Sequence, residues 1–508
     1  MKIKKFIITF FTGIMMGIFI TVTTSNWIRN NNSGEIFKHL KKSILDDKNI
    51  TKNNKKKKVE NTRQNTKENN ENNIDNGDMK TIRVLLKTTG YKDILHDKAS
   101  FSCGCDMDVI YYKKDENGNL LEQSLKWGKE GEVVVNPDNE LLNDGIMKIT
   151  PEDRNYKISI NSIERNGCTP VYRGNIILSR NHGKITIVNE LPIEEYLYSV
   201  VPSEMPVSFG NEALKVQAVC ARSYAVSHLG GGELSMYDAD VDDSTDYQVY
   251  NNSGEKEEAI QAVSETKGQI MKHGDEIVNA YFFATSCGYT TDERIWGNKT
   301  KEYIKSKSVT EKEENINLTD EETFKKFIKS NFDSFDKGNP WYRWKISYTE
   351  KELAGVINDN INRLVTLGGD KILTYNGSEF VPGKPSPVNK IRDIFITSRS
   401  EGGVANELVI DAENEKIKIL SQTFIRNIFN PYGIKIDKCD GSFNDKMNCL
   451  PSGFFVIEKN DDRFTLYGGG FGHGVGMSQT AVKNMANNGM TYEDILKFFY
   501  KDIDVVKY

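Results

Sequence analysis

The chain has 508 residues, which is enough for a folded core without disulfide or metal staples. Hydrophobic residues make up only 38%, and the shortfall is concentrated near the N-terminus. A net charge of −5, from 67 basic and 72 acidic residues, argues against a nucleic-acid binder, because affinity for phosphate needs a positive field. Seven cysteines are too few for a disulfide scaffold.

The N-terminus predicts a membrane anchor. Residues 6–24 are apolar and uncharged, a run long enough for a helix that crosses roughly 30 Å of hydrocarbon. Three lysines within residues 1–5 favour a cytoplasmic tip. We therefore expect a single-pass signal anchor in the cell membrane, with the C-terminal domain on the extracytoplasmic side. A cleaved signal peptide is the alternative, although no convincing cleavage site follows the run.

Residues 25–80 predict a disordered polar tether. From about Asn30 to Asp78 the chain is dominated by Asn, Lys, Glu and Asp, and large apolar side chains are few. Such a segment cannot bury enough area to offset its ordering entropy. We expect folded sequence from about residue 81 to the C-terminus.

Alternating apolar and polar residues predict a β-rich part over residues 81–190. The expected strands include Thr81–Leu86, Val109–Tyr112, Tyr156–Ile160 and Lys184–Val188. From residue 191 the period changes to that of helices. The expected helices are Pro192–Val200, Asn211–Leu229, Glu255–Lys267, Ser478–Asn488 and Tyr492–Tyr500. Strands and helices that cluster without alternating predict an α+β fold, with a mixed helix and strand part over residues 191–508.

Glu204 is the first candidate for chemistry. It stands between Pro202 and Pro206, next to Met205, in the expected connection between two helices. A restrained backbone and apolar neighbours would fix the carboxyl and raise its pKa, as a general acid requires. An acidic cap for the following helix is an equally good interpretation.

Arg222 is the second candidate. It lies among alanines in a predicted helix, where a lone charge is unfavourable unless it meets a partner or a ligand. A structural salt bridge with Glu212 or Glu195 is the alternative.

Two further segments carry small polar residues beside glycine and aromatic rings. The first, residues 281–291, contains Ser286 and suits either a sugar-binding groove or an ordinary strand end. The second, residues 468–479, has six glycines in nine residues, followed by a helix that starts near Gln479. Glycine lets backbone approach a ligand closely, and His473 within this run favours a site over a merely flexible loop.

Metal-binding patterns are weak. The six histidines lack ligand spacing, and the Cys103-Gly-Cys105 sequence has no second pair to complete a tetrahedral site. Cys439 and Cys449 suit either a disulfide outside the cytoplasm or two free thiols.

Together these segments resemble the stage II sporulation protein D / amidase-enhancer (SpoIID/LytB) family. The matching motifs are Leu-Pro-x-Glu-x-Tyr-Leu from residue 191, Val-Val-Pro-Ser-Glu-Met-Pro from residue 200, Ala-Leu-Lys-x-Gln-Ala-Val-x-Ala-Arg-Ser-Tyr-Ala from residue 213, and Gly-His-Gly-Val-Gly-Met-Ser-Gln from residue 472. They occur in the family's order, and the resemblance extends over residues 81–508. It implies a SpoIID-like extracytoplasmic domain with a catalytic part from residue 191.

The resemblance implies a peptidoglycan lytic transglycosylase that cleaves the MurNAc-GlcNAc bond, preferably in glycan strands without stem peptides. The family's catalytic glutamate corresponds to Glu204. A single carboxyl suffices when it protonates the glycosidic oxygen and then takes a proton from the sugar's own hydroxyl, which closes an anhydro ring. The motif positions expected to bind substrate or support catalysis are Arg222, Gln248, Ser286, His473 and Gln479.

The sequence departs from the family pattern at one place. Some family members carry a zinc site just before the position that corresponds to Gln248. Residues 242–248 contain neither Cys nor His, so we expect no metal and no cofactor. The alternative to a metal-free protein is that the three aspartates in residues 242–248 hold a hard cation.

Two other functions remain open. A non-catalytic glycan-binding enhancer of a cell-wall amidase would keep the same groove. A cysteine hydrolase would use Cys287 and His473. The expected partners are glycan strands and an amidase or endopeptidase that removes stem peptides.

Overall fold

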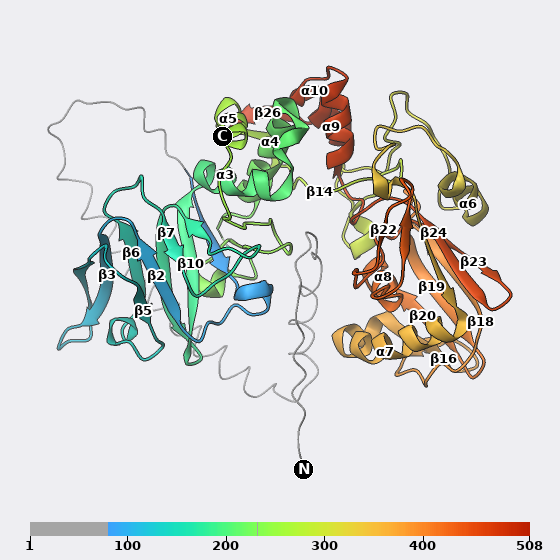
Figure 1. Ribbon diagram of the computed structural model, residues 1–508, viewed down its shortest axis with the longest axis horizontal. Helices are drawn as coiled ribbons and strands as arrows, with labels where there is room; N and C mark the ends of the chain where they lie inside the picture. The colour runs from blue at the N-terminus through green and yellow to red at the C-terminus, as the bar shows by residue number, and fades with distance from the viewer. Residues whose placement is uncertain (1–79, 231) are drawn as a thin grey trace, which may run out of the picture. The chain divides into compact units, whose positions relative to one another are not determined.

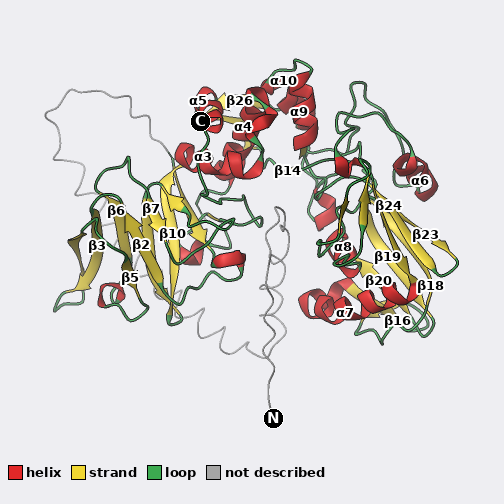
Figure 2. Ribbon diagram, viewed as in Figure 1, coloured by secondary structure: helices red, strands yellow, loops and turns green. Residues whose placement is uncertain are grey.

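The computed structural model describes residues 80–230 and 232–508 (Figure 1). The expected tip (1–5) and signal anchor (6–24), and the tether (25–80) up to residue 79, lie outside the described residues. Within the described residues, no helix combines the length and apolar character needed to span a membrane. Helices and strands form separate clusters, and the strands build several sheets, so the predicted α+β class is confirmed (Figure 2).

The N-terminal part of the described chain is built from two sheets. A seven-stranded sheet has the order β11-β1-β10-β9-β6-β3-β4, and a four-stranded sheet has the order β5-β2-β7-β8. The predicted strand at residues 156–160 begins later, at Ile158. The strands are β1 (Thr81–Leu86), β2 (Ala99–Cys103), β3 (Met107–Lys114), β4 (Leu120–Trp127), β5 (Val133–Val135), β6 (Met147–Pro151), β7 (Ile158–Ile160), β8 (Val171–Tyr172), β9 (Asn175–Asn181), β10 (Lys184–Pro192) and β11 (Val241–Asp242).

Five helices belong to the same half of the fold: three follow these strands in the sequence, and two come from the C-terminal end of the chain. They are α3 (Ile193–Glu204), α4 (Asn211–Ser227), α5 (Glu257–Glu265), α9 (Gln479–Asn487) and α10 (Tyr492–Phe499). All five lie where the sequence predicts helices, with ends that differ by a few residues. The expectation that Glu204 lies in an interhelical connection is wrong, because α3 continues through Pro202 and ends at Glu204 itself.

Short strand pairs bring the C-terminus back to the first helices. β12 (Gln269–His273) pairs with β13 (Glu276–Ile277) on one side and with β26 (Asp504–Lys507), at the end of the chain, on the other. β14 (Phe282–Phe283) pairs in parallel with β25 (Met477–Ser478). The glycine-rich segment is thereby held beside the segment that contains Ser286, although nearly 200 residues separate them.

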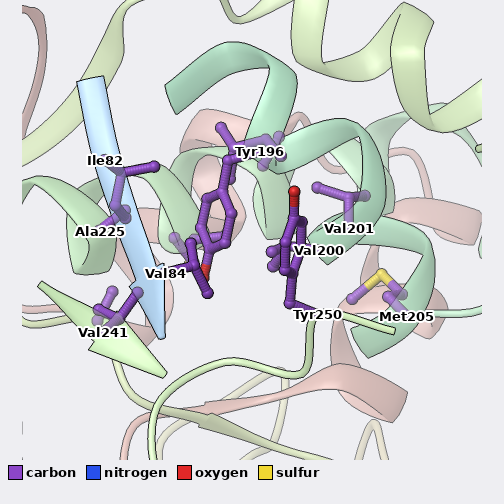
Figure 3. Close-up of a cluster of buried hydrophobic side chains, with 14 of the residues drawn as sticks. Ile82, Val84, Tyr196, Val200, Val201, Met205, Ala225, Val241 and Tyr250 are labelled. Atoms are coloured by element: carbon purple, nitrogen blue, oxygen red, sulfur yellow. The ribbon is translucent and has the colours of Figure 1, made fainter. Parts of the chain in front are cut away.

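A continuous hydrophobic core lies beneath α3 and α4. Tyr196 and Val200 of α3 pack with Ala225 of α4 against Ile82 and Val84 of β1 (Figure 3). All five side chains are buried, so this packing fixes the direction in which the end of α3 points.

The intervening residues, from about 290 to 476, contain a second core. Two five-stranded sheets have the orders β22-β21-β15-β24-β23 and β17-β16-β20-β19-β18. Their buried side chains, with those of α7 and α8, form a cluster separate from the first. The elements are α6 (Glu321–Lys329), β15 (Trp344–Thr349), α7 (Glu350–Gly368), β16 (Ile372–Tyr375), β17 (Phe380–Pro382), β18 (Ile391–Arg399), β19 (Ala405–Ala412), β20 (Lys416–Leu420), α8 (Gln422–Ile428), β21 (Ile436–Lys438), β22 (Phe443–Asn444), β23 (Phe455–Asn460) and β24 (Arg463–Gly468).

Candidate active site

Glu204 is a partly buried carboxyl at the C-terminal end of α3. Burial raises its pKa to about 7, against a smaller opposing effect of a hydrogen bond from the backbone N–H of Val249. That N–H donates to Oε1 at 2.7 Å. No ion pair in the described part of the chain involves this carboxyl. A carboxyl in this environment can be protonated near neutral pH and can still ionise, which suits a group that both gives and takes a proton.

Gln479 contacts the backbone of Glu204. Its Nε2 donates to the carbonyl oxygen of Glu204 at 3.0 Å and to Oε1 of Gln217 at 3.3 Å. The structure therefore brings Gln479, at the start of α9, directly to the candidate catalytic residue. Gln217 lies within the α4 motif, yet the sequence analysis did not single it out.

Gln248 lies next to Val249 but faces the interior. It is fully buried, accepts a hydrogen bond from the hydroxyl of Tyr196 at 3.3 Å, and donates to the carbonyl oxygen of Ala221 at 3.4 Å. These contacts join the loop around residue 248 to α3 and α4. Gln248 thus fixes the loop that carries the Val249 amide, and its burial leaves no surface for a glycan.

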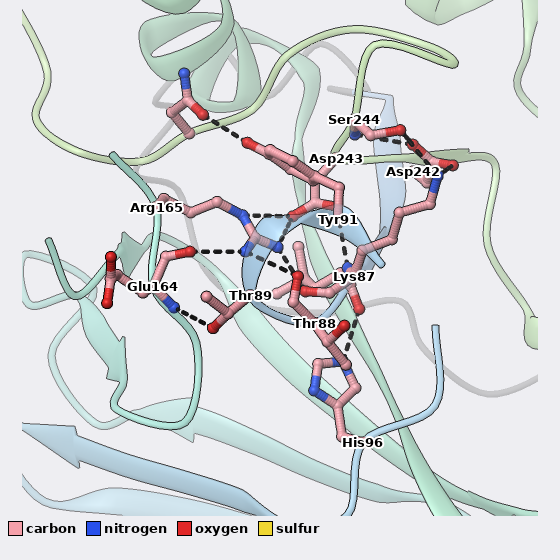
Figure 4. Close-up of polar contacts among 12 residues, drawn as sticks. Lys87, Thr88, Thr89, Tyr91, His96, Glu164, Arg165, Asp242, Asp243 and Ser244 are labelled. Carbon is pink, nitrogen blue, oxygen red and sulfur yellow. Dashed lines mark hydrogen bonds and ion pairs between the residues drawn. The ribbon is translucent and has the colours of Figure 1, made fainter. Parts of the chain in front are cut away.

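Three aspartates near Gln248 are paired with basic side chains, and Figure 4 shows two of them, Asp242 and Asp243. Nζ of Lys87 lies 2.8 Å from Asp242 and 2.6 Å from Asp246. The guanidinium of Arg165 contacts Asp243 through Nε, at 3.1 Å, and through Nη2. Since the carboxylates already meet internal cations, the donor set does not fit a hard metal ion. In residues 80–230 and 232–508, no group of three or more potential ligands could hold a metal.

Arg222 is fully buried and forms an ion pair with Glu194. Its Nε and Nη2 donate to the two carboxylate oxygens at 2.8 and 2.7 Å, and its remaining contacts go to Thr266 and to backbone carbonyls of residues 263 and 269. The partner is therefore neither Glu212 nor Glu195. The pair joins α3, α4 and the end of α5, and among the described residues no hydrogen bond or ion pair links Arg222 to Glu204.

Ser286 belongs to a buried hydrogen-bond cluster around Asp336. The Ser286 hydroxyl donates to Asp336 at 2.6 Å, and the hydroxyls of Thr285 and Ser478 donate to the same carboxylate at 2.8 and 2.5 Å. All four side chains are buried, and desolvation raises the pKa of Asp336. The cluster joins residues 285–286 to the glycine-rich segment. The sequence analysis missed Asp336, because no motif contains it.

Both ring nitrogens of His473 are occupied. Nδ1 accepts a hydrogen bond from the backbone N–H of Val475 at 3.0 Å, so the proton lies on Nε2, which donates to the carbonyl oxygen of Phe282 at 3.0 Å. Burial, with a contribution from the charge of Arg426, lowers the pKa of His473 to about 3. The ring is therefore neutral at physiological pH and joins two backbone segments, beside Trp296.

The glycines allow close packing of this segment. Gly476 has a φ of 78°, and a Cβ there would lie 2.2 Å from the carbonyl oxygen of Tyr281. At Gly474 a Cβ would lie 2.5 Å from the ring of Phe454. The run is thus an ordered, tightly packed segment, as opposed to a flexible loop.

The cysteines do not support a thiol nucleophile. Cys287 is fully buried, and burial raises its pKa to about 12, whereas nucleophilic attack needs a thiolate. All seven cysteines are free, including Cys439 and Cys449.

Comparison with known proteins supports the same family. Residues 181–273, which include Glu204, Arg222 and Gln248, match the family model described as Stage II sporulation protein (SpoIID). Residues 290–476, which contain Asp336, match a domain of unknown function (DUF8618).

Curated relatives are 26–28% identical to the chain over the aligned residues. The stage II sporulation protein D of Bacillus subtilis (strain 168) is 28% identical over 332 residues, covering 63% of this chain and 75% of the relative. That of Bacillus amyloliquefaciens is 26% identical over 350 residues, or 66% and 78%. The amidase enhancer of Bacillus subtilis (strain 168) is 26% identical over 315 residues, covering 61% of this chain but only 40% of the relative. The family-model match and these relatives support the resemblance of the chain to the stage II sporulation protein D / amidase-enhancer (SpoIID/LytB) family.

Proposed function

We propose that this protein is a peptidoglycan lytic transglycosylase that acts on MurNAc-GlcNAc glycan strands in spore engulfment or cell-wall remodelling. The observation that supports this proposal most directly is the single carboxyl of Glu204, with a pKa near 7 and no ion-pair partner among the described residues. The names of the relatives support the sporulation setting. The apolar run at residues 6–24 supports a membrane anchor with the enzyme on the wall side.

In this proposal Glu204 acts twice. The protonated carboxyl donates to the glycosidic oxygen as the bond to the anomeric carbon breaks. The resulting carboxylate then takes the proton of the muramic acid's carbon-6 hydroxyl, whose oxygen bonds to the anomeric carbon and closes the anhydro ring. No water is consumed, and Glu204 ends protonated, ready for another cycle.

In this proposal the other expected site residues support Glu204 through contacts within the protein. Gln479 and the loop fixed by Gln248 position Glu204 through its backbone and through the Val249 amide. Ser286 and His473 order the glycine-rich segment, and Arg222 joins the helices. All of them are positioning residues, because their polar atoms are used within the protein.

A non-catalytic enhancer of a cell-wall amidase is the second candidate function. The observation that favours it is the amidase enhancer among the relatives. In that case the protein would bind glycan and stimulate a partner amidase, and Glu204 would be dispensable.

The test uses purified protein and glycan strands stripped of stem peptides, with products identified by mass spectrometry. We expect anhydro-muramoyl ends from the wild type and none from Glu204→Gln. Glu195→Gln, a carboxyl on the same helix, is the matched control and should remain active. Reducing ends that have gained water would contradict the proposal in favour of hydrolysis. Strands that are bound but uncut by the wild type would favour the enhancer, whose stimulation of an amidase should survive Glu204→Gln.

A further inference from the structure

A pocket of about 290 Å³ lies in the region of unknown function, and among the motif segments discussed above it includes only Gly468, the first residue of the glycine-rich segment. It forms where the ends of β15, β21 and β24 meet the last turn of α6. Cross-strand pairing places Lys345 between Asp437 and Tyr467, and Trp344 between Lys438 and Gly468. Lys329 enters from α6, and Arg343 precedes β15.

The lining is strongly basic. Four cationic residues (Lys329, Arg343, Lys345 and Lys438) accompany one acidic residue, Asp437, which already pairs with Lys435 at 2.6 Å. Lys329 pairs with Glu458 at 2.9 Å. No ion pair joins Lys345 or Lys438 to a carboxylate in the part of the chain that the structure describes. Lys438 interacts electrostatically with the exposed carboxylate of Asp440 without forming an ion pair. Lys345 and Lys438 therefore give the pocket a positive charge that the protein does not neutralise locally.

Arg343 has N–H groups that make no hydrogen bond within the described residues. Its Nη1 donates to the carbonyl oxygens of Cys287 and Tyr342, both at 2.8 Å. Its Nε and Nη2 are buried and have no hydrogen-bond partner among the described residues. Leaving buried N–H groups unpaired is unfavourable. The free Nε–Nη2 edge is the face of a guanidinium that matches two oxygens of a carboxylate or a phosphate.

We propose that this pocket binds an oxyanion, a carboxylate or phosphate group carried by an anionic polymer of the cell wall. Lys345 and Lys438 attract the group, and the Nε–Nη2 edge of Arg343 receives two of its oxygens. Because these two nitrogens are buried, binding requires a side-chain movement that exposes them. Tyr467 supplies a ring for the apolar part of the ligand.

The pocket is continuous in sequence with the candidate active site. Gly468 lines the pocket and begins the glycine-rich segment, whose continuation reaches Gln479 and its contact with Glu204. The cell-wall source of the oxyanion rests on the proposed function, whereas oxyanion binding itself does not.

The test is calorimetric titration of the full-length protein carrying Glu204→Gln, so that no glycan is cut. The probes are short poly-glutamate, a short poly-glycerol-phosphate and a neutral chito-oligosaccharide, each at low and high salt. We expect at least one anionic probe to bind in a salt-dependent manner and the neutral probe to bind independently of salt or not at all. A stronger poly-glutamate signal identifies a carboxylate ligand, and a stronger poly-glycerol-phosphate signal identifies a phosphodiester.

Variants locate the binding. Lys345→Gln combined with Lys438→Gln should lower the affinity for the anionic probe about tenfold, as removal of charge-assisted hydrogen bonds predicts. Arg343→Lys keeps the charge but loses the two-pronged edge, and should also weaken binding. Lys351→Gln, an exposed lysine on α7, is the control and should bind like the parent. Absence of binding to both anionic probes, or equal losses in the control, would overturn the proposal. Glycan cleavage by the wild type is measured separately, so the two proposals fail independently.

Discussion

The backbone amide of Val249 donates a hydrogen bond at 2.7 Å to Oε1 of Glu204, which lies 45 residues earlier in the chain, at the end of α3. This contact stabilises the carboxylate, while burial stabilises the neutral acid. Burial prevails, and the pKa of Glu204 rises to about 7. The balance leaves both protonation states accessible near neutral pH, and this has consequences for rate and for stability.

Glycan cleavage should decline as the pH rises through the pKa of Glu204. The first step needs the protonated carboxyl, which is lost above a pH of about 7. A profile of kcat/KM against pH should therefore show an alkaline limb near 7. A limb near the ordinary glutamate value, or a flat profile between about pH 5 and 9, would argue that another group is the acid.

The same pKa shift should make stability depend on pH. An ordinary glutamate in the unfolded chain ionises near 4.5, whereas Glu204 in the folded protein ionises near 7. Because the folded-state pKa is raised, its contribution is fully present below the unfolded pKa and is lost as the pH rises to the folded pKa. The loss is on the order of 1–3 kcal/mol, given the partial exposure of the side chain.

Glu204→Gln removes this titration. The variant should therefore gain stability relative to the wild type between pH 4.5 and pH 7, as measured by urea unfolding at several pH values. Glu195→Gln should follow the wild-type pH dependence. A constant difference between Glu204→Gln and the wild type across this range would contradict the raised pKa.

Gln479 should affect turnover more than binding. Its Nε2 holds the backbone carbonyl of Glu204, so Gln479→Ala should let the carboxyl move from its productive position. We expect kcat to fall about tenfold or more with a smaller change in KM. Gln479→Glu, which keeps the size but loses the donor, should resemble the alanine variant. If KM rises while kcat is unchanged, Gln479 contacts substrate instead of positioning Glu204.

The sequence predicted local features better than distant pairings. Strand alternation located β1 and β10, and the position of Glu204 between prolines pointed to the candidate acid. The predicted helix end at Val200 was misplaced, because the helix continues to Glu204 and accommodates Pro202 in its last turn. The partners of Arg222 and of Asp242 could not be chosen from the sequence, since several carboxylates or cations were equally available.

Asp336 shows why part of the site was missed. It lies 50 residues from Ser286 and 142 residues from Ser478, in a stretch without a recognisable motif. Only the fold brings these residues together. Buried polar clusters of this kind are specified by tertiary contacts, which one sequence does not reveal.

Asp336 should be a major contributor to stability. Its carboxylate accepts hydrogen bonds from three buried hydroxyls and from the backbone N–H of Ser286. Asp336→Ala leaves these donors unpaired in the interior, which should lower the free energy of unfolding by about 2–4 kcal/mol. Urea unfolding at pH 7 measures the change.

Two further variants separate the hydrogen bonds from the charge. Asp336→Asn retains an acceptor oxygen without the burden of a buried charge, and should lose less stability than Asp336→Ala. Asp333→Ala removes an exposed carboxylate three residues earlier, whose contact is with Lys337, and should change stability by no more than about 0.5 kcal/mol. Similar losses for Asp336→Ala and Asp333→Ala would show that the cluster does not stabilise the fold. A large loss at Asp336 alone would identify it as the side chain that holds the glycine-rich segment, and with it Gln479, in place beside Glu204.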